Sequence, residues 1–163
     1  MVDVMEGQAV CLIDMVFPGD TNHHGTLFGG VALAHMDKVA FLAATRHGRS
    51  PFVTAASEKI DFANPALIGD IVEVTGRVAR VGNSSLDVEV ELMAESPVSG
   101  ERRLCTRGRF TLVAVKGPGS RLPLPKLVEM PEQPSDGRLR MVNIVFPGQT
   151  NHHATLYEAM RSN

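Results

Sequence analysis

A long helix is predicted over residues 27–46, which read LFGGVALAHMDKVAFLAATR. Apolar residues occupy nearly every side of that helix, whereas a helix with one side in water carries a broad polar face. The helix is predicted to end at His47-Gly48, because glycine is the usual residue just past a helix C-terminus. We therefore expect this helix to be buried at the centre of the domain.

The residues that follow alternate apolar and polar side chains, with the period of two that is typical of strands with one face in water. Turn signals at 81–84 and 96–100 make the last three strands consecutive antiparallel neighbours. One helix after one strand and before four strands in meander order predicts an α+β domain, in which an antiparallel sheet wraps around one long central helix. The five predicted strands cover residues 9–17, 53–62, 72–79, 86–92 and 102–115.

The composition is that of an ordinary globular protein without a nucleic-acid footprint. The 163 residues include 16 Lys plus Arg and 18 Asp plus Glu, a net charge of −2, and are 44% hydrophobic and 21% charged. One Tyr, no Trp and no run of basic residues leave neither the positive patch nor the stacking aromatics that nucleic-acid binding needs. Nucleic acid is therefore excluded as a partner.

The cysteines and the N-terminal sequence predict a reduced, cytoplasmic protein. Cys11 and Cys105 lie 94 positions apart without a CxxC spacing, so neither a disulfide scaffold nor a zinc ribbon is indicated. Residues 1–10 show no basic stretch followed by an apolar one, as a secretory leader would. The apolar run at 27–44 contains three titratable residues, which predicts a buried helix rather than a membrane span.

An internal repeat divides the chain. Residues 13–28, IDMVFPGDTNHHGTLF, recur 129 positions later at residues 142–157, VNIVFPGQTNHHATLY, with ten of sixteen positions identical. That period fits a whole small domain rather than a solenoid unit. Between the copies, residues 117–136 hold five of the ten prolines, as an extended linker would. We therefore predict three segments: a domain over 1–116, a proline-rich linker over 117–141, and a truncated start of a second repeat over 142–163.

The second copy has only part of the first copy's candidate site. Asn22 has a counterpart in Asn151, but position 166, which would match Asp37, lies beyond the 163 residues. The pair Gly29-Gly30 is replaced by Glu158-Ala159. The tail is therefore not expected to form a second active site.

Asp37 is the first candidate for chemistry. Its neighbours at i±3 and i±4 on the helix are Leu33, Ala34, Ala40 and Phe41, so its carboxylate projects from an apolar stripe. A carboxylate in such a place needs a partner or a functional role. Two interpretations stay open at this point: a catalytic group, and a helix-edge Asp that reaches solvent or a polar group at a subunit interface.

The segment before the helix, DTNHHGTLFGG at residues 20–30, is the second candidate. Free backbone N–H groups at a helix N-terminus can hold a carbonyl oxygen or a developing oxyanion, and glycines let a ligand approach the backbone. The alternative is a plain loop with Thr26 as the helix cap. The segment matches neither the GxxxxGK[ST] nor the GxGxxG phosphate-binding pattern.

Other chemistries are weakly indicated. His23 and His24 are adjacent and no third ligand stands at a recognised spacing, so no metal site is predicted. There is no GxSxG elbow, and Cys105 falls in a strand without an evident base. The turn at 81–85 could donate hydrogen bonds to a phosphate or amide, although a plain hairpin turn explains it as well.

These motifs together resemble the hotdog-fold acyl-CoA thioesterases of the cytosolic acyl-CoA hydrolase type. The resemblance covers the whole predicted folded unit and implies a sheet wrapped around a central helix, with active sites where two such units pair. The residues that carry it are DTNHHGTLFGG at 20–30, AHMDKVA at 34–40, SEKIDFANPALIGDIVEV at 57–74, RVGNSS at 80–85 and FTLVAV at 110–115.

The resemblance also implies roles for particular residues. Asp37 would be the general base or nucleophile, Asn22 would orient water or thioester from the facing subunit, and Gly30 would help to polarise the thioester carbonyl. Substrate binding would involve Gly29, His24, Gly82, Asn83, Ser84 and Ser85. No catalytic role follows for His24.

The implied reaction is hydrolysis of medium- or long-chain acyl-CoA to a fatty acid and CoA, without a cofactor or metal. The implied assembly is a homodimer or a higher homo-oligomer such as a trimer of dimers, with no membrane partner. Two alternatives remain: an acyl-CoA-binding or regulatory hotdog module without turnover, and an acyl-thioester hydratase. The hydratase would need a His and carboxylate motif that this sequence does not show.

Overall fold

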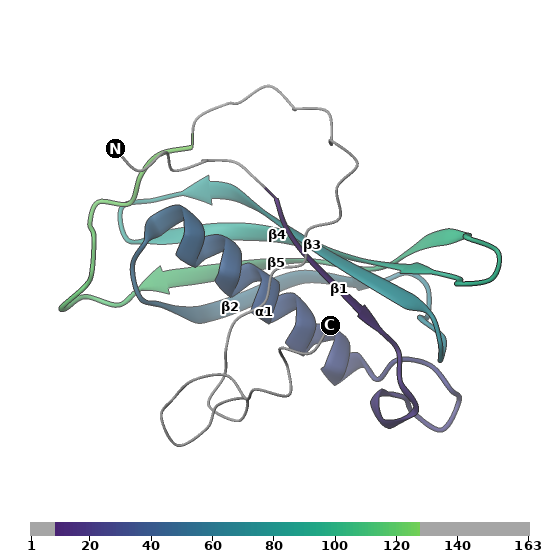
Figure 1. Ribbon diagram of the computed structural model, residues 1–163. Helices are drawn as coiled ribbons and strands as arrows, with labels where there is room; N and C mark the ends of the chain where they lie inside the picture. Colours follow the sequence, from purple (N-terminus) through teal and green to yellow (C-terminus); the bar gives the residue numbers. More distant parts are fainter. Residues whose placement is uncertain (1–8, 128–163) are drawn as a thin grey trace, which may run out of the picture.

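The structure is a computed structural model that describes residues 9–127. One strand and a short 3₁₀ helix precede a long helix and four more strands, within three residues of the predicted bounds (Figure 1). The predicted second repeat at 142–163 lies outside the described residues, as does the linker after residue 127. The elements are β1 (Val10–Met15), η1 (Pro18–Asp20), α1 (Gly29–Gly48), β2 (Phe52–Phe62), β3 (Ile71–Val81), β4 (Ser85–Glu95) and β5 (Arg102–Ala114).

All five strands form one antiparallel sheet in the order β1-β3-β4-β5-β2. The α+β class and the antiparallel sheet with one long helix are confirmed, and they are the hotdog arrangement. The prediction of four strands in meander order is wrong for β2, which pairs with β5 rather than with β3. Pairing there covers the long edge of β5, which would otherwise present unpaired N–H and C=O groups.

The connection from β2 to β3 crosses the end of the sheet to make this order possible. It is fixed at both sides, because the Ala63 amide donates to the Cys105 carbonyl at 2.8 Å and the Gly69 amide to the Val16 carbonyl at 2.8 Å. An ion pair between Asp70 and Arg103, both largely buried, ties the same connection to β5. These are long-range contacts, which explains why periodicity alone did not place β2.

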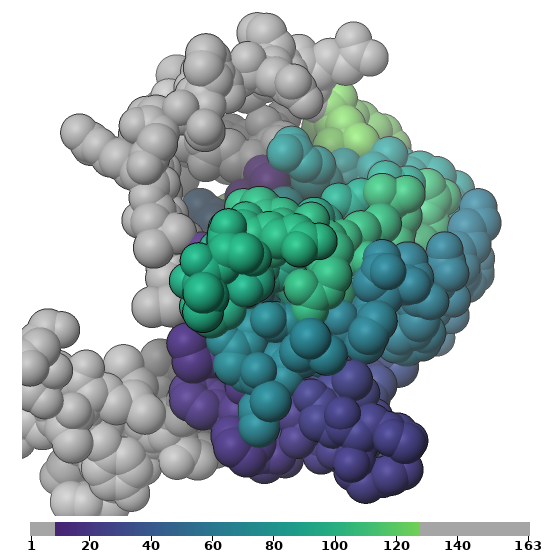
Figure 2. Space-filling view, turned by 90° about the vertical axis from the view of Figure 1, so that its right-hand side faces the viewer, coloured from purple at the N-terminus to yellow at the C-terminus, as the bar shows by residue number. Residues whose placement is uncertain are grey.

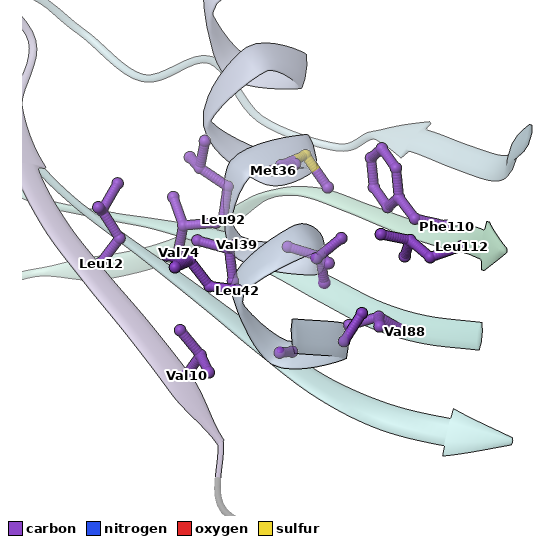
Figure 3. Close-up of a cluster of buried hydrophobic side chains, with 14 of the residues drawn as sticks. Val10, Leu12, Met36, Val39, Leu42, Val74, Val88, Leu92, Phe110 and Leu112 are labelled. Atoms are coloured by element: carbon purple, nitrogen blue, oxygen red, sulfur yellow. The ribbon is translucent and has the colours of Figure 1, made fainter. Parts of the chain in front are cut away.

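Helix α1 lies diagonally across one face of the sheet (Figure 1). Met36 and Val39 are fully buried against strand residues such as Val88 and Leu92 (Figure 3). The backbone approaches closely at Gly76, where a Cβ atom would stand 2.7 Å from Val39 Cγ1. A larger residue there would push the helix off the sheet, since real Cβ atoms essentially never come that close.

The opposite face of α1 is not covered by the sheet. Gly30 and Ala34 are exposed, and Asp37 and Phe41 are half-buried. These four residues are spaced by four, three and four positions, so they form one stripe along the helix. The sequence predicted a helix buried nearly all round; within the described residues the sheet covers one side only, and an apolar stripe with one carboxylate stays open.

The segment after β5, residues 117–127, runs back over the domain and is called the strap below. Its Leu124 is 2% exposed and belongs to the hydrophobic core. Its backbone is held by His47 Nε2, 2.6 Å from the Pro125 carbonyl, and by the Ser50 hydroxyl, which accepts from the Arg121 amide at 2.8 Å. The strap lies within the range predicted as linker, and it has no regular secondary structure, yet it packs on the domain.

Candidate active site

Asp37 projects from the open stripe of α1 towards β2. The Thr54 hydroxyl donates a hydrogen bond of 2.7 Å to Asp37 Oδ1. A hydroxyl donor orients a carboxylate and leaves its second oxygen available to a ligand or a water molecule. The structure therefore adds Thr54 to the candidate residues. Sequence reasoning placed Thr54 in a strand but had no signal that its side chain faces Asp37.

Asn22 organises the loop that leads into α1. Its Oδ1 accepts from the His24 amide at 2.9 Å, from the Thr26 amide at 3.2 Å and from the Thr26 hydroxyl at 3.0 Å, while its Nδ2 donates to that hydroxyl at 2.8 Å. The side chain thus closes a tight local turn. His24 itself is exposed, and its ring lies 3.8 Å from that of His23 with the planes tilted by 44°.

Helix α1 begins at Gly29 with Phe28 as its N-cap and without a side-chain cap. The alternative in which Thr26 caps the helix is wrong, because the Thr26 hydroxyl donates its hydrogen bond to Asn22 Oδ1 instead. In the described part of the chain, the backbone N–H groups of Gly29 and Gly30 have no acceptor, while those of the next two residues bond to the Phe28 carbonyl. Two adjacent N–H groups with the positive end of the helix dipole are therefore available to an oxygen atom.

These groups do not converge within one copy of the chain. Asp37 follows Gly30 by seven residues, which is about 10 Å along the helix axis at 1.5 Å per residue. The two cannot act on the same carbonyl group from one helix. The hairpin at 82–85 is further away, because it lies at the C-terminal end of α1 while Asn22 lies at the N-terminal end (Figure 1).

The hairpin at 82–85 connects β3 to β4. The Gly82 amide donates to the Ser85 carbonyl at 2.7 Å, the Ser84 carbonyl accepts from the Ala114 amide at 2.8 Å, and the Asn83 carbonyl accepts from the Leu124 amide at 2.9 Å. The backbone of the hairpin is thereby fixed to β5 and to the strap. Asn83 and Ser84 line a cavity of about 480 Å³ together with Lys116, Leu122 and Pro123.

A second cavity, of about 280 Å³, lies beside the N-terminal end of α1. Gly29, Phe62 and Cys105 are among its lining residues.

Burial raises the pKa of the Cys105 thiol, and burial with the nearby Glu73 carboxylate raises the pKa of the Cys11 thiol. Both thiols are therefore held in the neutral form near pH 7, which makes them poor nucleophiles.

Figure 2 views the molecule from the end at which α1 begins, and the loop before α1 lies there below the hairpin between β4 and β5.

Among residues 9–127, no group of three or more His, Cys, Asp and Glu side chains is arranged to hold a metal ion. No helix of the described residues is long and apolar enough to cross a membrane.

Comparison with known proteins links this fold to thioester hydrolysis. Residues 24–101 match the thioesterase superfamily. An uncharacterized acyl-CoA thioester hydrolase of Bacillus subtilis (strain 168) is 39% identical over 118 residues, which are 72% of this chain and 69% of that protein. The chain spans only 31% of the mammalian cytosolic acyl coenzyme A thioester hydrolases that it matches. These similarities confirm the resemblance that the motifs indicated.

Solved structures extend the similarity. An acyl-CoA hydrolase of Agrobacterium tumefaciens is 50% identical, with a TM-score of 0.82 over 96% of this chain and 63% of that chain. An acyl-CoA hydrolase of Staphylococcus aureus, solved with butyryl coenzyme A and coenzyme A, is 31% identical, with a TM-score of 0.70 over 76% of each chain. A hexameric acyl-CoA thioesterase is 38% identical, with a TM-score of 0.71 over 76% of this chain and 80% of that one.

The Staphylococcus aureus enzyme has also been solved with alanine in place of an asparagine, an aspartate and a threonine. The asparagine precedes the aspartate by 15 residues and the threonine follows it by 17. Asn22, Asp37 and Thr54 have the same two spacings in this chain. Thr54, which sequence reasoning missed, is thus one of three residues whose types and spacings match the three that were substituted in this relative.

Proposed function

Because the chain belongs to the hotdog-fold acyl-CoA thioester hydrolases and is a thioester hydrolase, we propose that it converts medium- or long-chain acyl-CoA to a fatty acid and CoA. One observation carries the assignment of the site: within residues 9–127, the N–H groups of Gly29 and Gly30 at the start of α1 are unpaired, and Asp37 lies on the open stripe of the same helix. The N–H groups offer a pre-positioned acceptor site for the thioester oxygen, and the carboxylate is suited to accept a proton.

The reaction needs one water molecule and no cofactor. The thioester oxygen accepts hydrogen bonds from Gly29 and Gly30, which stabilise the negative charge as the tetrahedral intermediate forms. Asp37 removes a proton from the attacking water, with Thr54 holding its Oδ1. The C–S bond of the tetrahedral intermediate then breaks, and Asp37 returns the proton that it took from water to the departing CoA thiolate. Direct attack by the Asp37 carboxylate, to form an anhydride that water hydrolyses, uses the same residues.

Two copies of the chain complete the site. Asp37 and Gly30 are about 10 Å apart along one helix, so the carboxylate of one copy acts at the helix N-terminus of another. Antiparallel pairing of two α1 helices about a two-fold axis beside Leu33 and Ala34 brings the Asp37 of each copy to the helix N-terminus of the other. The dimer then has two equivalent sites. The exposed stripe and the hexameric state of solved relatives support a homo-oligomer. In this arrangement Asn22 orients water or thioester at the partner's Asp37, and His24 borders the substrate.

We place the protein in the cytoplasm, as expected for an enzyme of soluble acyl-CoA and in line with the cytosolic relatives. Its partners are then acyl-CoA and further copies of itself, with neither nucleic acid nor membrane required.

A thiol-release assay with acyl-CoA substrates of increasing chain length tests the proposal. The parent should release CoA, and Asp37→Ala should lower kcat by at least about a hundredfold, the scale of removing a general base. Glu101→Gln is the matched control, since Glu101 lies in the exposed hairpin between β4 and β5. Equal turnover by Asp37→Ala and the parent would refute the mechanism. Binding of acyl-CoA without release at any chain length would favour the non-catalytic module.

A further inference from the structure

The cavity of about 280 Å³ lies between the first turn of α1 and the sheet, and its inner wall is buried. Ala32, Leu92 and Cys105 line it, and each of them is at most 4% exposed. No residue on its wall, which belongs wholly to residues 9–127, carries a charge. An uncharged, mostly apolar wall is suited to an apolar ligand and not to an anion.

Small side chains on α1 and a bulge in β5 leave this space open. Gly29 and Ala32 line the cavity from α1, and neither carries more than one methyl group. The register between β4 and β5 shifts by one residue at Cys105. A bulge of this kind bends its strand locally. The sheet and the start of the helix therefore do not close on each other at this point.

The connection from β2 to β3 forms the opposite wall, and hydrogen bonds hold it in place. The Leu27 amide donates to the Ala66 carbonyl at 2.8 Å, which ties the connection to the start of α1. The Asn64 side-chain amide donates to the Leu104 carbonyl at 2.8 Å, which ties it to β5. The cavity is therefore preformed, and a ligand does not have to order its walls.

The outer end of the cavity lies at the site proposed for the thioester. Gly29 lines the cavity and also supplies one of the two N–H groups that are unpaired within residues 9–127. The Phe62 ring lies over Gly29, since a Cβ atom there would stand 3.9 Å from two of its carbon atoms, and Phe62 is 57% exposed. A thioester oxygen bound at Gly29 would thus place the adjoining acyl chain at the entrance to the cavity.

The inner end is closed. Leu92 is fully buried beneath α1 and belongs to the hydrophobic core (Figure 3). Core side chains are packed too closely to admit further atoms without strain. An apolar chain that enters beside Phe62 can therefore extend only as far as Leu92.

We propose that this cavity, inside one copy of the chain, takes the acyl chain of the substrate and limits it to about twelve carbon atoms. This inference rests on the proposed function and selects the medium chain lengths within it. An apolar cavity of about 150 Å³ holds benzene, which has six carbon atoms. In proportion, 280 Å³ has room for about eleven carbon atoms, and the carbonyl carbon at Gly29 adds one.

Titration calorimetry of the full chain with S-alkyl coenzyme A thioethers tests the inference without turnover, because a thioether has no carbonyl group to hydrolyse. Burial of one CH₂ group corresponds to about a fourfold change in affinity. The Kd should therefore fall about fourfold for each added CH₂ group up to about twelve carbon atoms, and level off beyond that length.

Variants that fill the cavity should move this limit. Ala32→Leu adds three carbon atoms from the helix side, so the Kd should level off about three carbon atoms earlier. Ala66→Leu adds the same atoms from the opposite wall and should have the same effect, which keeps the test valid if one variant does not fold. The matched control is Ala79→Leu, the same change at an exposed residue of β3 that does not line the cavity, with an unchanged limit.

The outcomes separate the cavity from the proposed function. A Kd that keeps falling to sixteen carbon atoms, a Kd that does not depend on chain length, or the same limit in the parent and both cavity-filling variants would overturn the inference. If thioesters are hydrolysed in any of those cases, the proposed function stands without it. If the thioethers show the limit and its shift but no acyl-CoA is hydrolysed, the proposed function fails and the cavity remains an acyl-chain site.

Discussion

The N-terminal end of α1 exposes aromatic side chains, whereas its C-terminal end exposes cations. Phe17, Phe28 and Phe62 are each more than half exposed around the start of the helix. Arg49 and Lys116 lie at the other end without carboxylate partners in the described residues. An acyl-CoA has the same asymmetry, with an apolar chain on one side of the thioester and phosphates on the other. In the antiparallel pair proposed above, the N-terminal end of one α1 and the C-terminal half of the other border the same site, so one acyl-CoA would meet both kinds of surface.

The segments at the two ends of α1 are held in different ways. Side-chain hydrogen bonds of Asn22 shape the N-terminal loop, whereas the strap at the C-terminal end adds burial of Leu124 to its hydrogen bonds with His47 and Ser50. Hydrogen bonds are directional and fix the positions of individual N–H groups, as catalysis needs. Burial is not directional, and it helps to hold a segment that has no regular secondary structure. Substitutions in the strap should therefore lower the free energy of unfolding, whereas substitutions in the N-terminal loop should mainly lower kcat.

The largest effect is expected at the strap. Leu124→Ala should lower the free energy of unfolding by about 3 kcal/mol, the usual cost of emptying a leucine site in a core. Leu127→Ala is the matched control, since Leu127 is 37% exposed on the same segment. Urea denaturation of both variants measures the difference. Equal stabilities would show that the strap adds nothing to the fold and that the domain effectively ends at residue 116.

A smaller effect, on turnover, is expected at the other end. Asn22→Asp keeps the oxygen that accepts from the His24 and Thr26 amides, so the loop should stay folded. It removes the amide donor, one of whose N–H groups bonds to the Thr26 hydroxyl, and kcat should fall about a hundredfold, the lower end of what one pre-positioned donor contributes. Melting temperature and thiol release, measured together, separate the two roles. Asn22→Ala should lower both, and full activity in Asn22→Asp would leave Asn22 a structural role only.

Local patterns in the sequence predicted the elements at both ends, but not what each element contacts. The period of the apolar residues is a local property, and it predicted α1 and the strands around it. The place of β2 beside β5 depends on contacts such as that between Ala63 and Cys105, which are far apart in sequence. The packing of the strap on the domain could not be predicted for a related reason. Its prolines predict an extended segment, and nothing local distinguishes the buried Leu124 from the exposed Leu127.

The smallest effect is expected at Thr54, which lies between the two ends and was not among the residues singled out from sequence. Thr54→Val keeps the shape of the side chain but removes the hydrogen bond to Asp37 Oδ1. A hydrogen bond to a charged group contributes about 1.5–3 kcal/mol, so kcat should fall at least about tenfold. Thr54→Ser keeps the hydroxyl and should stay within about threefold of the parent.

Stability and affinity separate this role from a packing role. Thr54 is exposed in the single chain, so neither variant should shift the melting temperature by more than about 2 °C. The affinity for coenzyme A should also persist in Thr54→Val, because Thr54 contacts Asp37, which acts on the thioester group that coenzyme A lacks. If Ser and Val variants lost the same activity, the methyl group rather than the hydroxyl would matter, and Asp37 would have to be oriented by another residue.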